Sequence, residues 1–413
     1  MTEPGGKVRL DLPLYIDQDW VRDGVEWGNP YYTGKVEAGW PRTAGRRAWV
    51  LHVDARANVF PTAGRSSVLE AVRKYCDLPL DKVKDWVLDW PADPKVTYPR
   101  LYVEPGKLDA VRARVKANPR WMGRFGQYYN RPISYTILGD AQIGDALVRA
   151  PSSNAAWNTP NDSQGALESL RSLVGKFWEH GYMGFPAPNN AAPMNELIKF
   201  DAAMSAATAT PGEKAEMRRL MAFVANVVAD QDWHSTRSGV HLGNPNMPPR
   251  QEHHLGVASC VLPDHPLAAA WRQRGEAEAM RELDEMVREA GTWRECPHYQ
   301  YEAAMYPLFQ SAVPIAYNGG QNIFTHPKMT ATWDYLLNIS TPPDPRFGTR
   351  LVPAFGNGSW EQAPLFGWLA NLTKTDAPAF SRRMQWMWIE QGRPDWMQFS
   401  ETMLDPALPA EPP

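Results

Sequence analysis

Polar side chains suited to acid–base and anion-binding chemistry gather in two stretches of the sequence. The first, residues 234–254, reads HSTRSGVHLGNPNMPPRQEHH, and its Gly and Pro residues forbid a regular helix where its asparagines stand. Amides on such a constrained loop can be aimed at a ligand, although asparagines that cap helices or form Asx turns fit the same pattern. The candidates here are His241, Asn244, Asn246, Arg250, His253 and His254.

The second stretch, residues 291–306, reads GTWRECPHYQYEAAMY, a loop followed by a helix that Pro297 opens. Side chains at a loop-to-helix junction can project into a cleft and contact a ligand. For Tyr299, the residues alone favour a half-buried helical tyrosine without a chemical role. The candidates in this stretch are Trp293, Arg294, Glu295, His298, Tyr299 and Gln300.

A metal site built from the histidines of the first stretch and Glu252 is disfavoured. His253 and His254 are adjacent, so on a helix they point about 100° apart, whereas two ligands on one face need a spacing of three or four. We therefore expect no metal and no other cofactor. Two roles stay open for these histidines: an ordinary structural role, or a role in substrate binding or proton transfer.

The elements that must position these residues differ along the chain. Residues 1–98 are rich in Gly, Pro, Trp and Tyr, with the extended runs VRLDLPLYI and AWVLHVDA, and predict strands and loops. One helix, SSVLEAVRKYC, is expected there after the N-cap residues Ser66 and Ser67. Residues 396–413 form a Pro-rich tail.

Between these two segments, residues 99–395 predict helical hairpins separated by Pro- and Gly-rich loops. Thr210, Pro211 and Glu213 give one helix a cap, a first-turn proline and an early acid. Antiparallel helix pairs without strands between them form a bundle, a solenoid or a closed ring, and no fixed repeat period is present. We therefore expect a mainly α fold, an (α/α) toroid whose loops form a cleft at one end. The expected helices lie in 104–119, 163–181, 192–209, 210–233, 265–291, 297–317 and 326–339, with two more between 359 and 390.

The composition of the chain excludes some classes of binding partner and favours others. A net charge of −3 argues against a nucleic-acid binder, and no stretch reaches the roughly 18 unbroken apolar residues of a membrane span. The start, MTEPGGKVRLDL, lacks the apolar region of a signal peptide. Eighteen Trp and 15 Tyr offer flat apolar faces to sugar rings, although core packing explains most single aromatic residues. Carbohydrate is the expected ligand, with no nucleic acid or membrane partner.

The run from Gly291 to Ala304 resembles a motif of heparinase II/III-like and alginate lyase-type polysaccharide lyases. In that motif a Gly-rich loop with an aromatic residue and Glu leads to a Tyr-Gln or Tyr-His pair, which matches Tyr299 and Gln300. The segment GNPNM around Asn246 resembles the family's asparagine loop, although Met247 stands where the family has Asn, His or Trp. YPRLYVEPGKLDAVRARV and TPPDPRFGTRLVPAFGNGSW are similar to further stretches, and the similarity spans residues 98–395.

The resemblance implies an enzyme that cleaves an acidic, uronate-containing polysaccharide by β-elimination. Asn246 would bind the uronate carboxylate, and Tyr299 would protonate the leaving oxygen or act as base. It also implies a periplasmic or secreted location and a C-terminal β-sheet domain with a further catalytic histidine, which we expect to be lacking here. Because free tyrosine has a pKa near 10, a base role needs a positive charge nearby. The candidates for that charge are Arg294, His298, His241 and Arg250.

Two other functions remain open. A glycoside hydrolase on the same toroid would use paired carboxylates, for which Glu252, Glu295, Glu302 and Glu361 are candidates. A non-catalytic module would hold a glycan between aromatic rings and release no product. Replacing Tyr299 by Phe separates the cases, because it abolishes product in a lyase and leaves affinity intact in a binding module.

Overall fold

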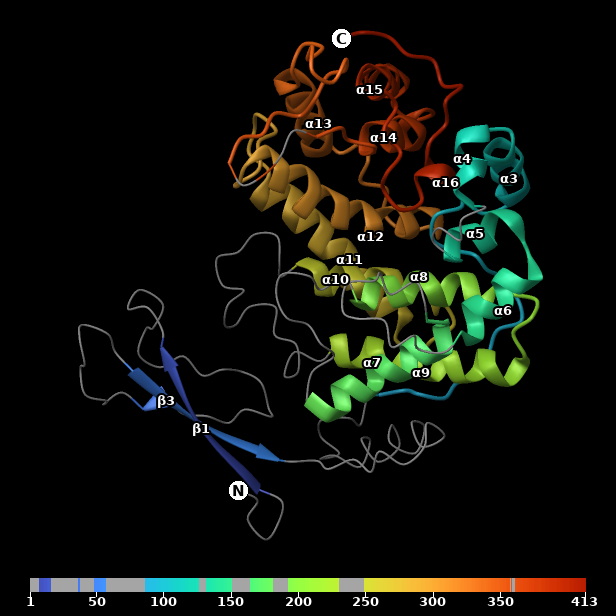
Figure 1. The fold of residues 1–413 in the computed structure, drawn as a ribbon, viewed down its shortest axis with the longest axis vertical. Coiled ribbons are helices and arrows are strands. Elements are labelled where there is room, and N and C mark those ends of the chain that lie inside the picture. Colours follow the sequence, from blue (N-terminus) through green and yellow to red (C-terminus); the bar gives the residue numbers. More distant parts are fainter. Residues whose placement is uncertain are drawn as a thin grey trace.

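The computed structural model describes the backbone of residues 7–15, 36–37 and 48–56, together with residues 86–125, 131–150, 164–180, 192–229, 249–356, 358 and 361–413. Residues 86–413, as far as they are described, are mainly α-helical (Figure 1). The mainly α fold predicted from the sequence is therefore confirmed. No described helix is both long enough and apolar enough to cross a membrane.

Three strands lie in the N-terminal part. β1 (Lys7–Tyr15) pairs antiparallel with β3 (Ala48–Arg56), and the short β2 (Val36–Glu37) pairs with the other edge of β3. The helix predicted for SSVLEAVRKYC lies outside the described residues.

The helices follow one another with short connections. The first group is α3 (Leu108–Lys116), α4 (Pro119–Phe125), α5 (Arg131–Leu138), α6 (Ala141–Arg149), α7 (Ala166–His180), α8 (Ala192–Met204) and α9 (Pro211–Ala229). The second is α10 (Pro249–Val261), α11 (Ala268–Arg281), α12 (Tyr306–Tyr317), α13 (Pro327–Ile339), α14 (Leu365–Thr373), α15 (Pro378–Glu390) and α16 (Ser400–Met403). In Figure 1, α13–α15 lie at one end of the helical part and α7 and α9 at the other, with α10–α12 between them.

Every helix predicted between residues 104 and 390 has a counterpart in this set. The capping signal at α9 forms as expected: the Glu213 amide donates to Thr210 Oγ1 (3.3 Å), and the Thr210 amide donates to Glu213 Oε2 (2.8 Å). These reciprocal bonds satisfy two amides that the helix itself leaves unpaired.

Two predicted helices contain π-helical segments. Residues 265–291 hold α11 followed by η5 (Glu282–Met286), and residues 297–317 hold η6 (Tyr299–Met305) followed by α12. Single π-helical turns inside longer helices occur frequently at functional sites. Glu282 and Glu302 stand in these two segments.

The crossing of α10 and α11 depends on two glycines. A Cβ atom on Gly275 would lie 2.6 Å from the Cα atom of Gly256, closer than packed atoms approach, so any larger side chain forces the helices apart. Arg274 and Glu252 bridge the same crossing through two hydrogen bonds of 2.8 and 2.7 Å. The separation of these two helices is therefore closely fixed.

Residues from the beginning and the end of the helical part are joined at Asp395. This buried carboxylate accepts hydrogen bonds from Arg120 Nη2 (2.9 Å), Arg124 Nη2 (2.6 Å) and Trp121 Nε1 (3.0 Å), all on α4. Farther along the chain, Met403 and Leu404 are buried as well. We call Asp395 and its three partners the Asp395 clasp.

Residues 86–98 also pack against the helices. Trp90 Nε1 donates to Asp264 (3.2 Å), and the Tyr98 hydroxyl donates to the carbonyl of Val261 (2.8 Å). Residues on both sides of the boundary predicted at position 98 thus contact the helical part.

Candidate functional site

His298 lies between two carboxylates. Its Nδ1 is 2.7 Å from Glu361 Oε1, and its Nε2 is 3.1 Å from Glu302 Oε2. An imidazole donates from both nitrogens only when it is protonated, so this arrangement suits an imidazolium ion. Glu302 is half exposed, with 49% of its side chain accessible, whereas His298 and Glu361 are mostly covered.

Two glycines allow a loop to lie directly on the segment that carries His298. A Cβ atom on Gly358 would lie 2.4 Å from the His298 Cβ, and one on Gly356 would lie 2.6 Å from the Cys296 Cβ. Gly356 also has a φ of +79°, which other residues adopt at a cost. A side chain at either position would therefore collide with the segment that carries His298.

Tyr299 follows His298 and begins η6. The two rings are in edge contact, with centroids 5.6 Å apart and planes at 70°, and the tyrosine is half-buried. Arg294 is exposed, and its guanidinium donates to the carbonyl of Glu285 (3.1 Å). His298 is therefore in contact with the ring of Tyr299, whereas the Arg294 guanidinium is directed to a backbone carbonyl.

The loop before η6 is held from inside by Gln300. Its side-chain oxygen accepts from the Trp293 amide (3.2 Å), and its side-chain nitrogen donates to the carbonyl of Gly291 (2.7 Å). Gln300 and Trp293 are both buried, and the Trp293 indole donates to Glu295 (3.0 Å). In this conformation these side chains, predicted to bind substrate, shape the loop that carries His298.

Arg250, in the first turn of α10, connects the two stretches singled out in the sequence. Burial lowers the pKa of its guanidinium, and the carboxylates of Glu302 and Glu282 act in the opposite direction. Those two acids stand in the two π-helical segments. The described end of the first stretch therefore lies within electrostatic reach of the second.

Below Arg250, α10 carries a buried pair. His253 Nε2 lies 2.6 Å from Glu282 Oε1, and each side chain is only 1% exposed. Burial raises the pKa of Glu282, while His253 acts to lower it. The pair ties α10 to η5 beneath the surface and does not open to solvent.

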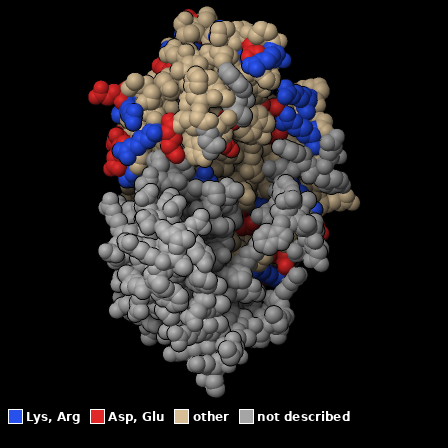
Figure 2. All heavy atoms as spheres, turned by 60° about the vertical axis from the view of Figure 1, so that its left-hand side comes forward, with Lys and Arg blue, Asp and Glu red and all other residues tan. Residues whose placement is uncertain are grey.

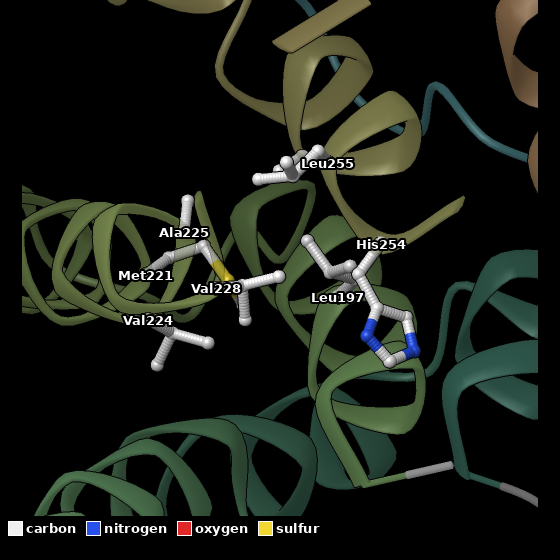
Figure 3. A pocket seen from close by; sticks show the side chains of 8 residues that line it. Leu197, Met221, Val224, Ala225, Val228, His254 and Leu255 are labelled. Carbon is white, nitrogen blue, oxygen red and sulfur yellow. The ribbon is translucent and has the colours of Figure 1, made fainter. Parts of the chain in front are cut away.

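His254 points elsewhere, as expected for the next residue on a helix. It lines a small cavity among α8, α9 and α10 with apolar side chains, including Leu197, Met221 and Val228 (Figure 3). The centre of a water molecule can move within only about 10 Å³ of this cavity, so it holds about one water. It is too small for a sugar ring.

A larger hollow opens on the other side of Glu361. It has a volume of about 310 Å³ and is lined by Phe347, Leu351, Glu361, Gln362 and Trp396. Phe347 and Trp396 are 54% and 49% exposed, unusually high for large apolar side chains. We call this space the aromatic hollow.

The aromatic hollow was not predicted from the sequence. Phe347 stands in the turn sequence DPRFGTR, where an aromatic residue among Asp, Pro and Gly signals exposure. The sequence offers Glu302 and Glu361 only as candidate hydrolase acids, and nothing in it joins them to His298. Basic and acidic side chains both occur on the described part of the face in Figure 2, separated by large areas of other residues.

Three predicted site residues, His241, Asn244 and Asn246, lie outside the described residues. Within the part of the chain that the structure describes, no group of three or more His, Cys, Asp or Glu side chains is arranged to hold a metal ion. Glu252, the carboxylate considered for such a site, is engaged by Arg274.

Comparison with known proteins leaves the chain without an assigned family. No protein-family model matches it, and no curated protein matches it. A function for this chain is therefore argued from its own residues.

Proposed function

We propose that this protein is a polysaccharide lyase that cleaves a uronic-acid-containing polysaccharide by β-elimination. The observation that carries the proposal is the contact of Tyr299 with His298, whose ring nitrogens face Glu302 and Glu361. A tyrosine whose ring contacts a histidine held between two carboxylates is placed to take part in proton transfer.

In the proposed reaction a base removes the proton at C5 of the uronate. The electron pair forms the C4–C5 double bond, and the bond from C4 to the leaving oxygen breaks. Tyr299 protonates that oxygen, and the positive charge of His298 stabilises the phenolate that remains. Asn246 neutralises the C6 carboxylate, a role that rests on the family resemblance. His241, which the sequence alone offers for proton transfer, is a candidate for the C5 base.

We also propose that the helices close into an (α/α) toroid. The Asp395 clasp supports this arrangement, because it joins α4, near the start of the helical part, to residues near its end. A ring of helical hairpins needs such a contact between its first and last members.

The test is absorbance near 235 nm during incubation with a panel of uronate polymers, because β-elimination creates a conjugated unsaturated uronate. We expect a rise with at least one polymer, its loss in Tyr299→Phe, and retained binding in that variant. Tyr335→Phe is the matched control, since Tyr335 is a half-buried tyrosine on α13, remote in sequence from the site. Equal rates for Tyr299→Phe and the wild-type protein would contradict the proposal.

A glycoside hydrolase is the second candidate, favoured by the two carboxylates that flank His298. It predicts new reducing ends without absorbance near 235 nm, and loss of product in both Glu302→Gln and Glu361→Gln. A glycan-binding module predicts neither signal, with affinity unchanged in Tyr299→Phe.

A further inference from the structure

The aromatic hollow has two apolar walls, Phe347 and Trp396, and Trp396 is held in place by its contacts. Trp396 Nε1 donates to the carbonyl of Gln362 (2.9 Å), and the indole meets the buried ring of Tyr301 edge-on at 6.4 Å between centroids. Its neighbour Asp395 is the centre of the clasp. The half-exposed indole is thus fixed before a ligand arrives, which lowers the entropy lost on binding.

The polar side chains of the hollow are the carboxylate of Glu361 and the amide of Gln362. Glu361 Oε1 is 2.7 Å from His298 Nδ1, so a protonated His298 offsets the negative charge of the carboxylate. Gln362 is held by a hydrogen bond from its side-chain nitrogen to Thr349 Oγ1 (2.9 Å). Among the described residues that line the hollow there is no Lys or Arg.

These features match one kind of occupant. A pyranose ring presents C–H groups on its face, which pack on aromatic rings, and hydroxyl groups on its edge, which donate to carboxylates. A sugar carboxylate in the hollow would be repelled by Glu361. The guanidinium of Arg346 lies over the Phe347 ring (5.4 Å to its centroid), but it is already paired with Asp344 through two hydrogen bonds (3.0 and 2.7 Å), so a uronate ring is disfavoured there. The volume of about 310 Å³ is at the lower end of the range for ligand sites.

We propose that the aromatic hollow is a subsite for a sugar ring without a carboxylate, adjacent to the His298–Glu361 pair. Resting on the proposed function, this deepens it: the substrate is a polymer in which a neutral sugar neighbours the cleaved uronate, and a polymer of uronate alone is bound less well.

The test is isothermal titration with three probes: cellohexaose, mannohexaose and a hexamannuronate. We expect at least one neutral hexasaccharide to bind, with its Kd raised about threefold to tenfold in Trp396→Ala and in Phe347→Ala. Phe355→Ala is the matched control, because Phe355 is 60% exposed and does not line the hollow. Its affinity should equal that of the wild-type protein.

A second variant guards against misfolding. Trp396→Phe keeps a ring at the site and should recover most of the affinity lost in Trp396→Ala. The subsite would be overturned if neither neutral probe bound, or if the hexamannuronate bound more tightly than both. It would also be overturned if Phe355→Ala and Trp396→Ala lost equal affinity for the neutral probe. Binding of tetramethylammonium that Trp396→Ala abolishes would identify a cation site instead.

Failure of the subsite and failure of the reaction give different results. Formation of unsaturated product at an unchanged KM in Trp396→Ala and Phe347→Ala overturns the subsite alone. Neutral sugar binding that depends on Trp396, without product from any polymer, overturns the reaction alone.

Discussion

His298 Nδ1 lies 2.7 Å from Glu361 Oε1, although the two residues are 63 positions apart in the chain. The contact joins the start of η6 to the residue that follows the glycine loop, and it places one carboxylate between the imidazole and the aromatic hollow. Glu361 therefore contacts both parts of the proposed site.

Glu361→Gln should slow product formation at 235 nm about tenfold or more, because it replaces the carboxylate charge that holds the His298 ring beside Tyr299 by a neutral amide. Glu302→Gln should have a smaller effect, since Glu302 is half exposed and its charge is screened by solvent. Initial rates at saturating polymer measure both changes. A larger loss in Glu302→Gln than in Glu361→Gln would show that the assignment of the two acids is reversed.

Gln300→Leu should lower the free energy of unfolding by about 2 to 4 kcal/mol, because it leaves the Gly291 carbonyl and the Trp293 amide buried without their partner. Urea denaturation followed by circular dichroism measures the change. Gln321→Leu, at an exposed position, is the control and should stay within about 0.5 kcal/mol of the wild-type protein. Similar midpoints for the two variants would show that the loop does not depend on Gln300.

Asp201 should make the protein less stable as pH rises. Burial raises the pKa of its carboxyl to about 7 from the usual value of 3.8, against the backbone amides of Arg100 and Leu101, which lower it. The folded state then binds more protons than the unfolded state between these values, so this contribution is full below about pH 4 and is lost as pH rises through 7.

The matching variant is Asp201→Asn, which cannot ionise. Between pH 5 and pH 8 it should remove a fall in the free energy of unfolding on the order of 2 to 3 kcal/mol, measured by urea titrations at each pH. An unchanged slope of stability against pH in the variant would assign the dependence to other groups.

Asp395→Ala should destabilise the protein by about 3 to 5 kcal/mol, because it leaves Arg120, Arg124 and the Trp121 indole without a shared acceptor. Asp376→Ala, at an exposed position, provides the control. A wild-type urea midpoint for Asp395→Ala would remove the support that the Asp395 clasp gives to ring closure.

The helices could be predicted because their signals are local. Thr210 and Glu213 lie three residues apart and cap α9 as the sequence indicates, and Pro327 begins α13 after His326. The π-helical segments could not be predicted, since a helical period is recognised over about 11 to 18 residues and a single wider turn is too short to stand out.

For the site, the sequence placed Tyr299 beside His298 because they are neighbours, but it carried no signal for Glu361 as a partner. It also made Trp293 a candidate for contact with substrate, whereas tertiary packing buries that ring and exposes Trp396. Which aromatic residue faces solvent is decided by contacts distant in sequence, and a single sequence does not contain them.

The adjacency of Asp395 and Trp396 has a mechanical consequence. Asp395 accepts three hydrogen bonds from α4, and the next residue, Trp396, lines the hollow with its indole ring. A molecule that occupies the hollow only when this wall is in place must, by thermodynamic linkage, also oppose separation of α4 from the segment around Asp395. Binding of a ligand in the hollow should then slow the hydrogen exchange of backbone amides in α4.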